Sequence, residues 1–124
     1  MSLASAFGAV LGLKRPLPDA LKSREDLQIA EIQRRFYGDL DVPPEQFLKV
    51  WSDIAEAFEV PAGKIRPGDR FGGELTYRPV FGLTEEDMIL GERLAKRMKE
   101  FGKRGSTPKL ISADDYVRFL LQNR

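Results

Sequence analysis

The pattern of apolar and polar positions predicts a long amphipathic helix over residues 44–59. Apolar residues recur there at i, i+3, i+4, i+7, i+10 and i+11, which places them on one helix face. They are Phe47, Val50, Trp51, Ile54, Ala57 and Phe58. Pro43-Pro44 suits the first helical turn, where proline sacrifices no helical hydrogen bond. Because apolar stripes at this spacing usually face the interior, we assign the aromatic residues to the core and not to a cofactor site.

Three tetrads along the chain resemble the capping box that starts many helices. They lie at residues 23–26, 84–87 and 112–115, and each pairs an N-terminal hydroxyl with an aspartate three positions later. The second precedes an apolar stripe at positions 90, 94, 98 and 101, and Gly102 is expected to end that helix. The third precedes a closing helix, and the first precedes a helix that runs to about Tyr37.

Residues 60–83 are rich in proline and glycine and cannot form a regular helix. The alternation from Leu75 to Phe81 is typical of a strand, which Pro79 would confine to a sheet edge. A connection of this length is uncommon in a compact domain, so we expect its own apolar residues to hold it in place. The candidates are Ile65, Phe71, Leu75, Tyr77 and Phe81.

Residues 1–41 are interpreted as an N-terminal helical extension of a domain over residues 42–124. The first apolar residues, at positions 3, 7, 10 and 11, have helical spacing. Two interpretations stay open for them, a loosely held terminus or a docking arm for a second subunit or another partner. The basic pair Lys14-Arg15 follows this apolar run, whereas a secretory signal has the reverse order. No apolar run approaches the ~20 residues of a membrane span, so we expect a cytoplasmic protein without membrane contact.

The composition excludes several classes of chemistry. The chain has no cysteine and no histidine, which removes disulfides, thiolate nucleophiles, the usual general base near neutral pH and the commonest metal ligand. Its carboxylate clusters at residues 85–87 and 114–115 lie where helix starts favour acids. The sequence therefore predicts a protein that is not an enzyme and has no cofactor and no metal.

Basic residues crowd the second half of the predicted helix over residues 84–101 and the turn after it. Spacings of i, i+4 and i+11 place Arg93, Arg97 and Arg104 on one face. We therefore predict that a partner with an acidic or phosphorylated surface binds there. The predicted partner-binding residues are Arg93, Lys96, Arg97, Lys103 and Arg104.

A solvated helix face is the plainer interpretation of such a charge run. Nucleic-acid binding also stays open, with Lys64, Arg66, Arg70 and Arg78 adding contacts and Tyr77 offering a stacking surface. The balance of 20 basic against 19 acidic residues weighs against that alternative.

Two segments resemble one family. Residues 60–71, VPAGKIRPGDRF, are similar to the loop entry of acyl carrier proteins, and residues 110–117, LISADDYV, resemble the approach to the last helix of that family. The resemblance extends over residues 42–124. It implies an all-α fold, a small helical bundle with a long pinned loop between its first and second core helices.

The same resemblance predicts that the family's prosthetic group is missing. Acyl carriers hold phosphopantetheine on a serine at the start of the second helix, but residues 81–88 contain no serine. Thr84 is the only hydroxyl there, and an N-cap is its simplest role. We therefore expect a non-catalytic protein-interaction domain on an acyl-carrier-like scaffold. A carrier with an unrecognised attachment site stays open as an alternative.

Overall fold

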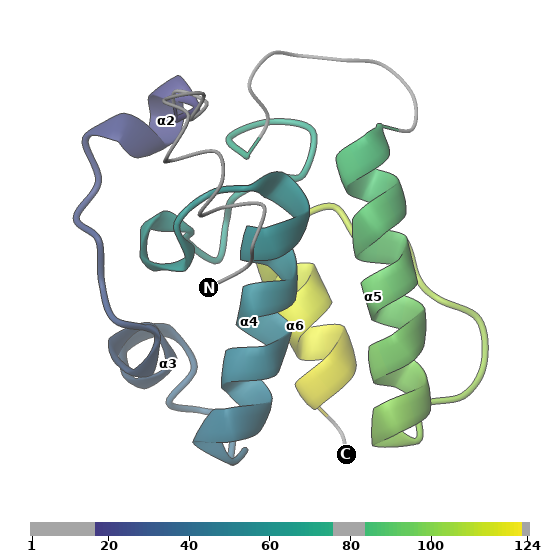
Figure 1. Cartoon of the computed structure of the whole chain (residues 1–124). Helices are drawn as coiled ribbons and strands as arrows, with labels where there is room; N and C mark the ends of the chain where they lie inside the picture. Colours follow the sequence, from purple (N-terminus) through teal and green to yellow (C-terminus); the bar gives the residue numbers. More distant parts are fainter. Residues whose placement is uncertain (1–16, 76–83, 123–124) are drawn as a thin grey trace, which may run out of the picture.

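The computed structural model describes residues 17–75 and 84–122, and this part of the chain is all-α, as predicted (Figure 1). The only pairing of extended backbone among these residues is an isolated bridge between Arg70 and Ser112. The helical elements are α2 (Asp19–Lys22), α3 (Ile29–Phe36), α4 (Pro44–Phe58), the short 3-10 helix η1 (Ala62–Lys64), α5 (Glu85–Phe101) and α6 (Ala113–Leu121). None of the helices described has the length and apolarity needed to span a bilayer.

Helix α4 forms the centre of the fold, with α3 on one side and α5 and α6 on the other (Figure 1). Its predicted apolar stripe is buried, with Trp51 fully enclosed at the middle. The indole stacks on Phe47 with ring centroids 5.5 Å apart, and its Nε1 donates to the carbonyl of Ala62 at 2.9 Å. The tryptophan therefore joins α4 to the loop that follows it, and its polar atom is satisfied in the core.

The capping boxes predicted for α5 and α6 are both formed. Thr84 Oγ1 accepts from the Asp87 amide at 3.1 Å, and the Asp87 carboxylate accepts from the Thr84 amide at 3.3 Å. Ser112 and Asp115 make the same pair of bonds at 3.2 and 3.1 Å. Gly102 is the C-cap residue that follows α5, and its φ of 72° is in the left-handed region that favours glycine.

We expect Thr84→Ala to lower the free energy of unfolding by about 1 kcal/mol, because it leaves helix amides at the start of α5 without an acceptor. Thr84→Ser retains the oxygen and is expected to keep most of that stability. Urea unfolding of the native protein and the two variants, followed by circular dichroism, measures the differences in their free energies of unfolding. Equal stability of the alanine and serine variants would contradict a capping role.

The helix start predicted at Ser23 is wrong. Ser23 follows the last residue of α2, and α3 begins only at Ile29, after Gln28. Long-range contacts explain the difference, because Arg24 pairs with Asp69 through bonds of 2.6 and 2.8 Å. These contacts hold the segment before α3 against the loop after α4 in a non-helical conformation.

Residues 17–41 contribute side chains to the same core as the other described residues. Leu21, Ile32 and Tyr37 are all fully buried within one apolar cluster that also contains Trp51. The described part of the predicted extension therefore completes the core around α4. The apolar residues at positions 3, 7, 10 and 11, which carry the docking-arm hypothesis, lie outside the described residues.

The described part of the loop after α4 contributes three of its apolar residues to the core. Ile65 and Leu75 are fully buried, and Phe71 stacks on Phe58 with ring centroids 5.5 Å apart. Backbone bonds then tie the loop to the start of α6, including one of 2.8 Å from the Phe71 amide to the carbonyl of Ile111. The rest of the predicted strand, with Tyr77 and Phe81, lies outside the described residues.

Candidate functional site

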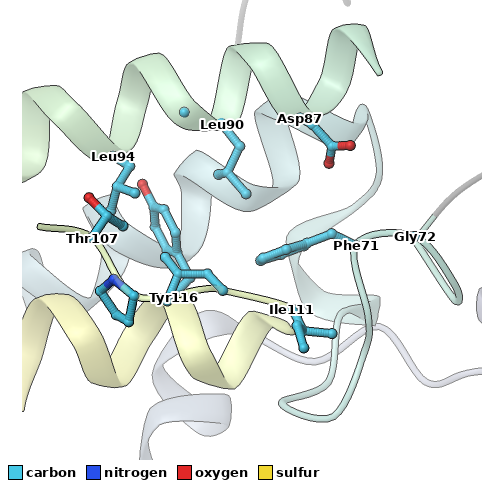
Figure 2. A pocket seen from close by; sticks show the side chains of 11 residues that line it. Phe71, Gly72, Asp87, Leu90, Leu94, Thr107, Ile111 and Tyr116 are labelled. Carbon is cyan, nitrogen blue, oxygen red and sulfur yellow. The ribbon is translucent and has the colours of Figure 1, made fainter. Parts of the chain in front are cut away.

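An open apolar groove of about 410 Å³ lies between α5, the start of α6 and the loop at Phe71 (Figure 2). Leu90 and Leu94 point into it from α5, and Phe71 and Tyr116 face it from the other elements. The lining is completed by residues from the same three elements and from the connection between α5 and α6. These are Gly72, Asp87, Gly91, Thr107, Pro108, Leu110 and Ile111.

Gly91 of α5 is one of the lining residues, and as a glycine it leaves its part of the groove wall without a side chain. Gly91 lines the groove together with Leu90 and Leu94, and a Cβ added to it would meet no atom within 4 Å. The neighbouring connection is extended and passes through Pro108, which cannot continue a helix. The sequence pattern predicted a buried apolar stripe on this helix. Gly91, which has no side chain, was the feature of the sequence that could have indicated a groove beside that stripe.

The polar side chains in the groove already have partners in the chain. Asp87 belongs to the capping box of α5, and the Thr107 hydroxyl lies 3.6 Å from the sulfur of Met98. The Tyr116 hydroxyl donates to Asp53 at 3.0 Å, and burial raises the pKa of this tyrosine above its ordinary value. The groove therefore offers mainly apolar surface, which suits an apolar side chain better than a polar ligand.

Beside the groove, Arg97 and Asp53 form a buried ion pair. Arg97 Nε and Nη2 donate to the two Asp53 oxygens at 2.8 and 3.0 Å, and a third bond from Arg97 reaches Glu100 at 3.0 Å. Only 8% of Arg97 is exposed. This burial corrects its assignment to an exposed basic face. The pair joins α4 to α5, while the bond from Tyr116 adds α6 to the cluster.

Two more of the predicted partner-binding cations are engaged within the chain. Arg93 lies 2.9 Å from Glu56 and 3.6 Å from Asp53, so it turns toward α4. Lys103 donates to the carbonyl of Gln122 at 3.0 Å and lies over the ring of Phe119. Lys103 thus stabilises the C-terminal end of α6, where free carbonyls favour a cation.

Lys96 and Arg104 are the predicted residues that remain available to a partner. Both are exposed, and neither has an ion-pair partner among the residues that the structure describes. Lys99 and Lys109 are exposed in the same way. The common face predicted for positions 93, 97 and 104 is not formed, because α5 ends at Phe101, before Arg104. We call Lys96, Lys99, Arg104 and Lys109 the basic set.

The loop cations proposed for nucleic-acid contact also have partners within the chain. Lys64 donates to the Lys22 carbonyl at 3.2 Å, Arg66 donates to the carbonyls of Gly63 and Glu25, and Arg70 pairs with Glu74. Arg78 and Tyr77 lie outside the described residues. The described part of the loop therefore adds no unpaired arginine to the basic set.

The Arg70–Glu74 pair predicts a dependence of stability on pH. Hydrogen bonds from the Arg70 guanidinium lower the pKa of Glu74 from 4.5 to about 2. A depressed native pKa adds stability above the unfolded pKa, and this stability is lost as pH falls from about 4.5 toward 2. Because both side chains are partly exposed, we expect at most about 1 kcal/mol. Urea unfolding of the native protein and of Glu74→Gln, measured across this pH range, gives the contribution as the difference between the two curves. If the two curves of stability against pH were parallel, the Arg70–Glu74 pair would make no pH-dependent contribution.

No known protein family, curated protein or solved structure matched this chain. Among the described residues, no group of three histidine, cysteine, aspartate or glutamate side chains is arranged to hold a metal ion. The groove and the basic set are therefore the features from which we argue a function.

Proposed function

We propose that this protein is a non-catalytic protein-interaction domain on an acyl-carrier-like scaffold, and that its partner binds along α5. The observation that carries this proposal is an open apolar groove along α5, together with exposed cations on α5 and on the connection after it that have no ion-pair partner among the described residues. An apolar centre with a charged rim is the usual anatomy of a protein–protein interface.

The order of elements supports the scaffold. Helix α4, a long pinned loop, α5, an extended connection and α6 follow in the sequence that the resemblance implies. Thr84 stands at the start of α5, where carriers hold the attachment serine, and its hydroxyl oxygen accepts from the Asp87 amide. This capping bond favours a scaffold that acts without the prosthetic group.

The local charge supports an acidic partner. The connection over residues 102–111 contains Lys103, Arg104 and Lys109 and no carboxylate. Lys96 and Lys99 are further exposed cations on α5. Since complementary charge guides association and orients partners, a partner that contacts α5 and this connection is expected to present an acidic surface.

Charge reversal tests the proposal. We expect Lys96→Glu combined with Arg104→Glu to reduce recovery of a crosslinked partner about tenfold, because like charges then oppose the acidic surface. The matched control is Arg34→Glu with Arg35→Glu on α3, which lies across α4 from α5 (Figure 1). Both positions are exposed. Quantitative mass spectrometry after crosslinking in cells gives the recovery.

Equal recovery with the two double variants would contradict the proposal. Arg93 and Arg97 are unsuitable for this test, because reversing Arg97 places a carboxylate against buried Asp53. A loss of folding would then be confused with a loss of binding. Circular dichroism of both double variants establishes that their helices are retained.

A further inference from the structure

We infer that the groove binds one large apolar side chain from a short acidic segment of a partner protein. This inference rests on the proposed function and adds where the partner is recognised and by what chemistry. The groove volume of about 410 Å³ is at the lower end of ligand-binding pockets, which range over about 300–1,000 Å³. It therefore suits one or two side chains better than a whole helix.

The apolar contact surface continues beyond the groove. Ile111, which lines it, is 50% exposed, and Met88, on the first turns of α5, is 56% exposed. Exposed apolar side chains beside an apolar groove favour an occupant that continues past its anchor, as a peptide does. Because the polar groups of the lining are satisfied within the chain, an anchor with its own unpaired polar atoms would lose hydrogen bonds on entering.

The two ends of the groove differ in charge. Asp87 lies at the end near Phe71, whereas Thr107 lies at the other end, near Leu94 (Figure 2). Thr107 belongs to the connection that contains Lys103, Arg104 and Lys109 and no acidic residue. Carboxylates of the occupant are therefore favoured at the Thr107 end, and repelled at the Asp87 end. This difference in charge determines which end of the groove the acidic residues of the segment occupy.

Selection from displayed random peptides on the full chain tests this inference without knowledge of the natural partner. We expect the enriched sequences to share one aromatic or large aliphatic residue with acidic residues beside it. A synthetic peptide of the most enriched sequence should shift the methyl NMR signals of Leu90, Leu94 and Ile111. Its affinity is then measured by fluorescence polarisation.

Gly91→Leu fills the groove and is the decisive variant. It is expected to weaken the peptide about tenfold or more, because the anchor loses its pocket. The variant should fold, since a Cβ at Gly91 meets no atom within 4 Å and leucine favours a helix more than glycine does. The matched control is Glu92→Leu, at an exposed neighbouring position that does not line the groove, and it should retain binding.

Four results would overturn the inference. They are no enriched peptide, enriched peptides without acidic residues, equal affinity for native protein and Gly91→Leu, and a single-stranded oligonucleotide that shifts the same methyl signals more strongly than the peptide. The proposed function is judged separately. One outcome separates the two: charge reversal at Lys96 and Arg104 abolishes recovery of the crosslinked partner, while Gly91→Leu leaves that recovery unchanged. This outcome would support the proposed interaction domain and would show that the groove is not its anchor site.

Discussion

Asp53→Ala is expected to lower the free energy of unfolding by about 3–5 kcal/mol, the usual cost of removing one partner from a buried ion pair. The Asp53 carboxylate is almost completely enclosed and accepts hydrogen bonds from Arg97 and from the Tyr116 hydroxyl. Alanine would leave a guanidinium and a hydroxyl in the core without their acceptor. Because small domains are stable by only about 5–15 kcal/mol, a large share of the total would be lost.

Urea unfolding measures this loss, and Glu56→Ala is the control. Glu56 pairs with Arg93 at the exposed edge of the same cluster, so its removal should cost no more than about 1 kcal/mol. Replacing both buried partners, as Asp53→Leu with Arg97→Met, is expected to recover part of the stability, because neither charge is then left alone. If Asp53→Ala cost no more than Glu56→Ala, the buried pair would not be a major determinant of stability.

The starts of α4, α5 and α6 were predicted from the sequence to within one residue. Their signals are local, since a capping box and an apolar stripe depend only on residues within the helix and beside it. The hydroxyls of Thr84 and Ser112 bond in the structure as the tetrads indicated. Helix α4 likewise begins at Pro44 and ends within one residue of its predicted end.

The same local reasoning was wrong at Ser23, because contacts distant in sequence override the tetrad there. The partner of Arg24 is Asp69, which lies 45 residues further along the chain. A single sequence does not pair an arginine with one particular aspartate at such a distance. The helix start predicted at residue 23 is therefore replaced by an extended segment that ends at Gln28.

The basic face was mispredicted for the same physical reason. Arg97 was grouped with its neighbours on α5, whereas its position is decided by Asp53 on another helix, 44 residues away. Asp53 lies outside the aromatic stripe of α4, so the pattern placed it on the polar side of the helix. The burial of an acidic residue on a mostly polar helix face cannot be recognised from the sequence pattern, because it depends on how the helices pack together. The groove is also a product of packing, because its lining comes from segments that are separated in the sequence: the loop at Phe71, α5, the connection after it and the start of α6.

Gly63→Ala is the second substitution with a large expected effect, about 2–3 kcal/mol of lost stability. Gly63 is buried in η1, and an added Cβ would overlap the carbonyl of Leu27 and the side chain of Asp26. The Gly63 carbonyl accepts from the Leu27 amide at 3.0 Å, so the methyl group would also separate this bond. A backbone carbonyl cannot rotate away as a side chain can, so the segment before α3 must move.

Gly68→Ala is the matched control, because it lies in the same loop and a Cβ there meets no atom within 4 Å. Its expected effect is within about 0.5 kcal/mol. Urea unfolding compares the two variants, and hydrogen exchange locates the change, since the Leu27 amide should lose protection in Gly63→Ala alone. Equal stability of the two variants would mean that the segment before α3 adjusts to the methyl group without cost. A loss confined to Gly63→Ala would instead establish that close backbone contact at this glycine joins the segment before α3 to the loop after α4.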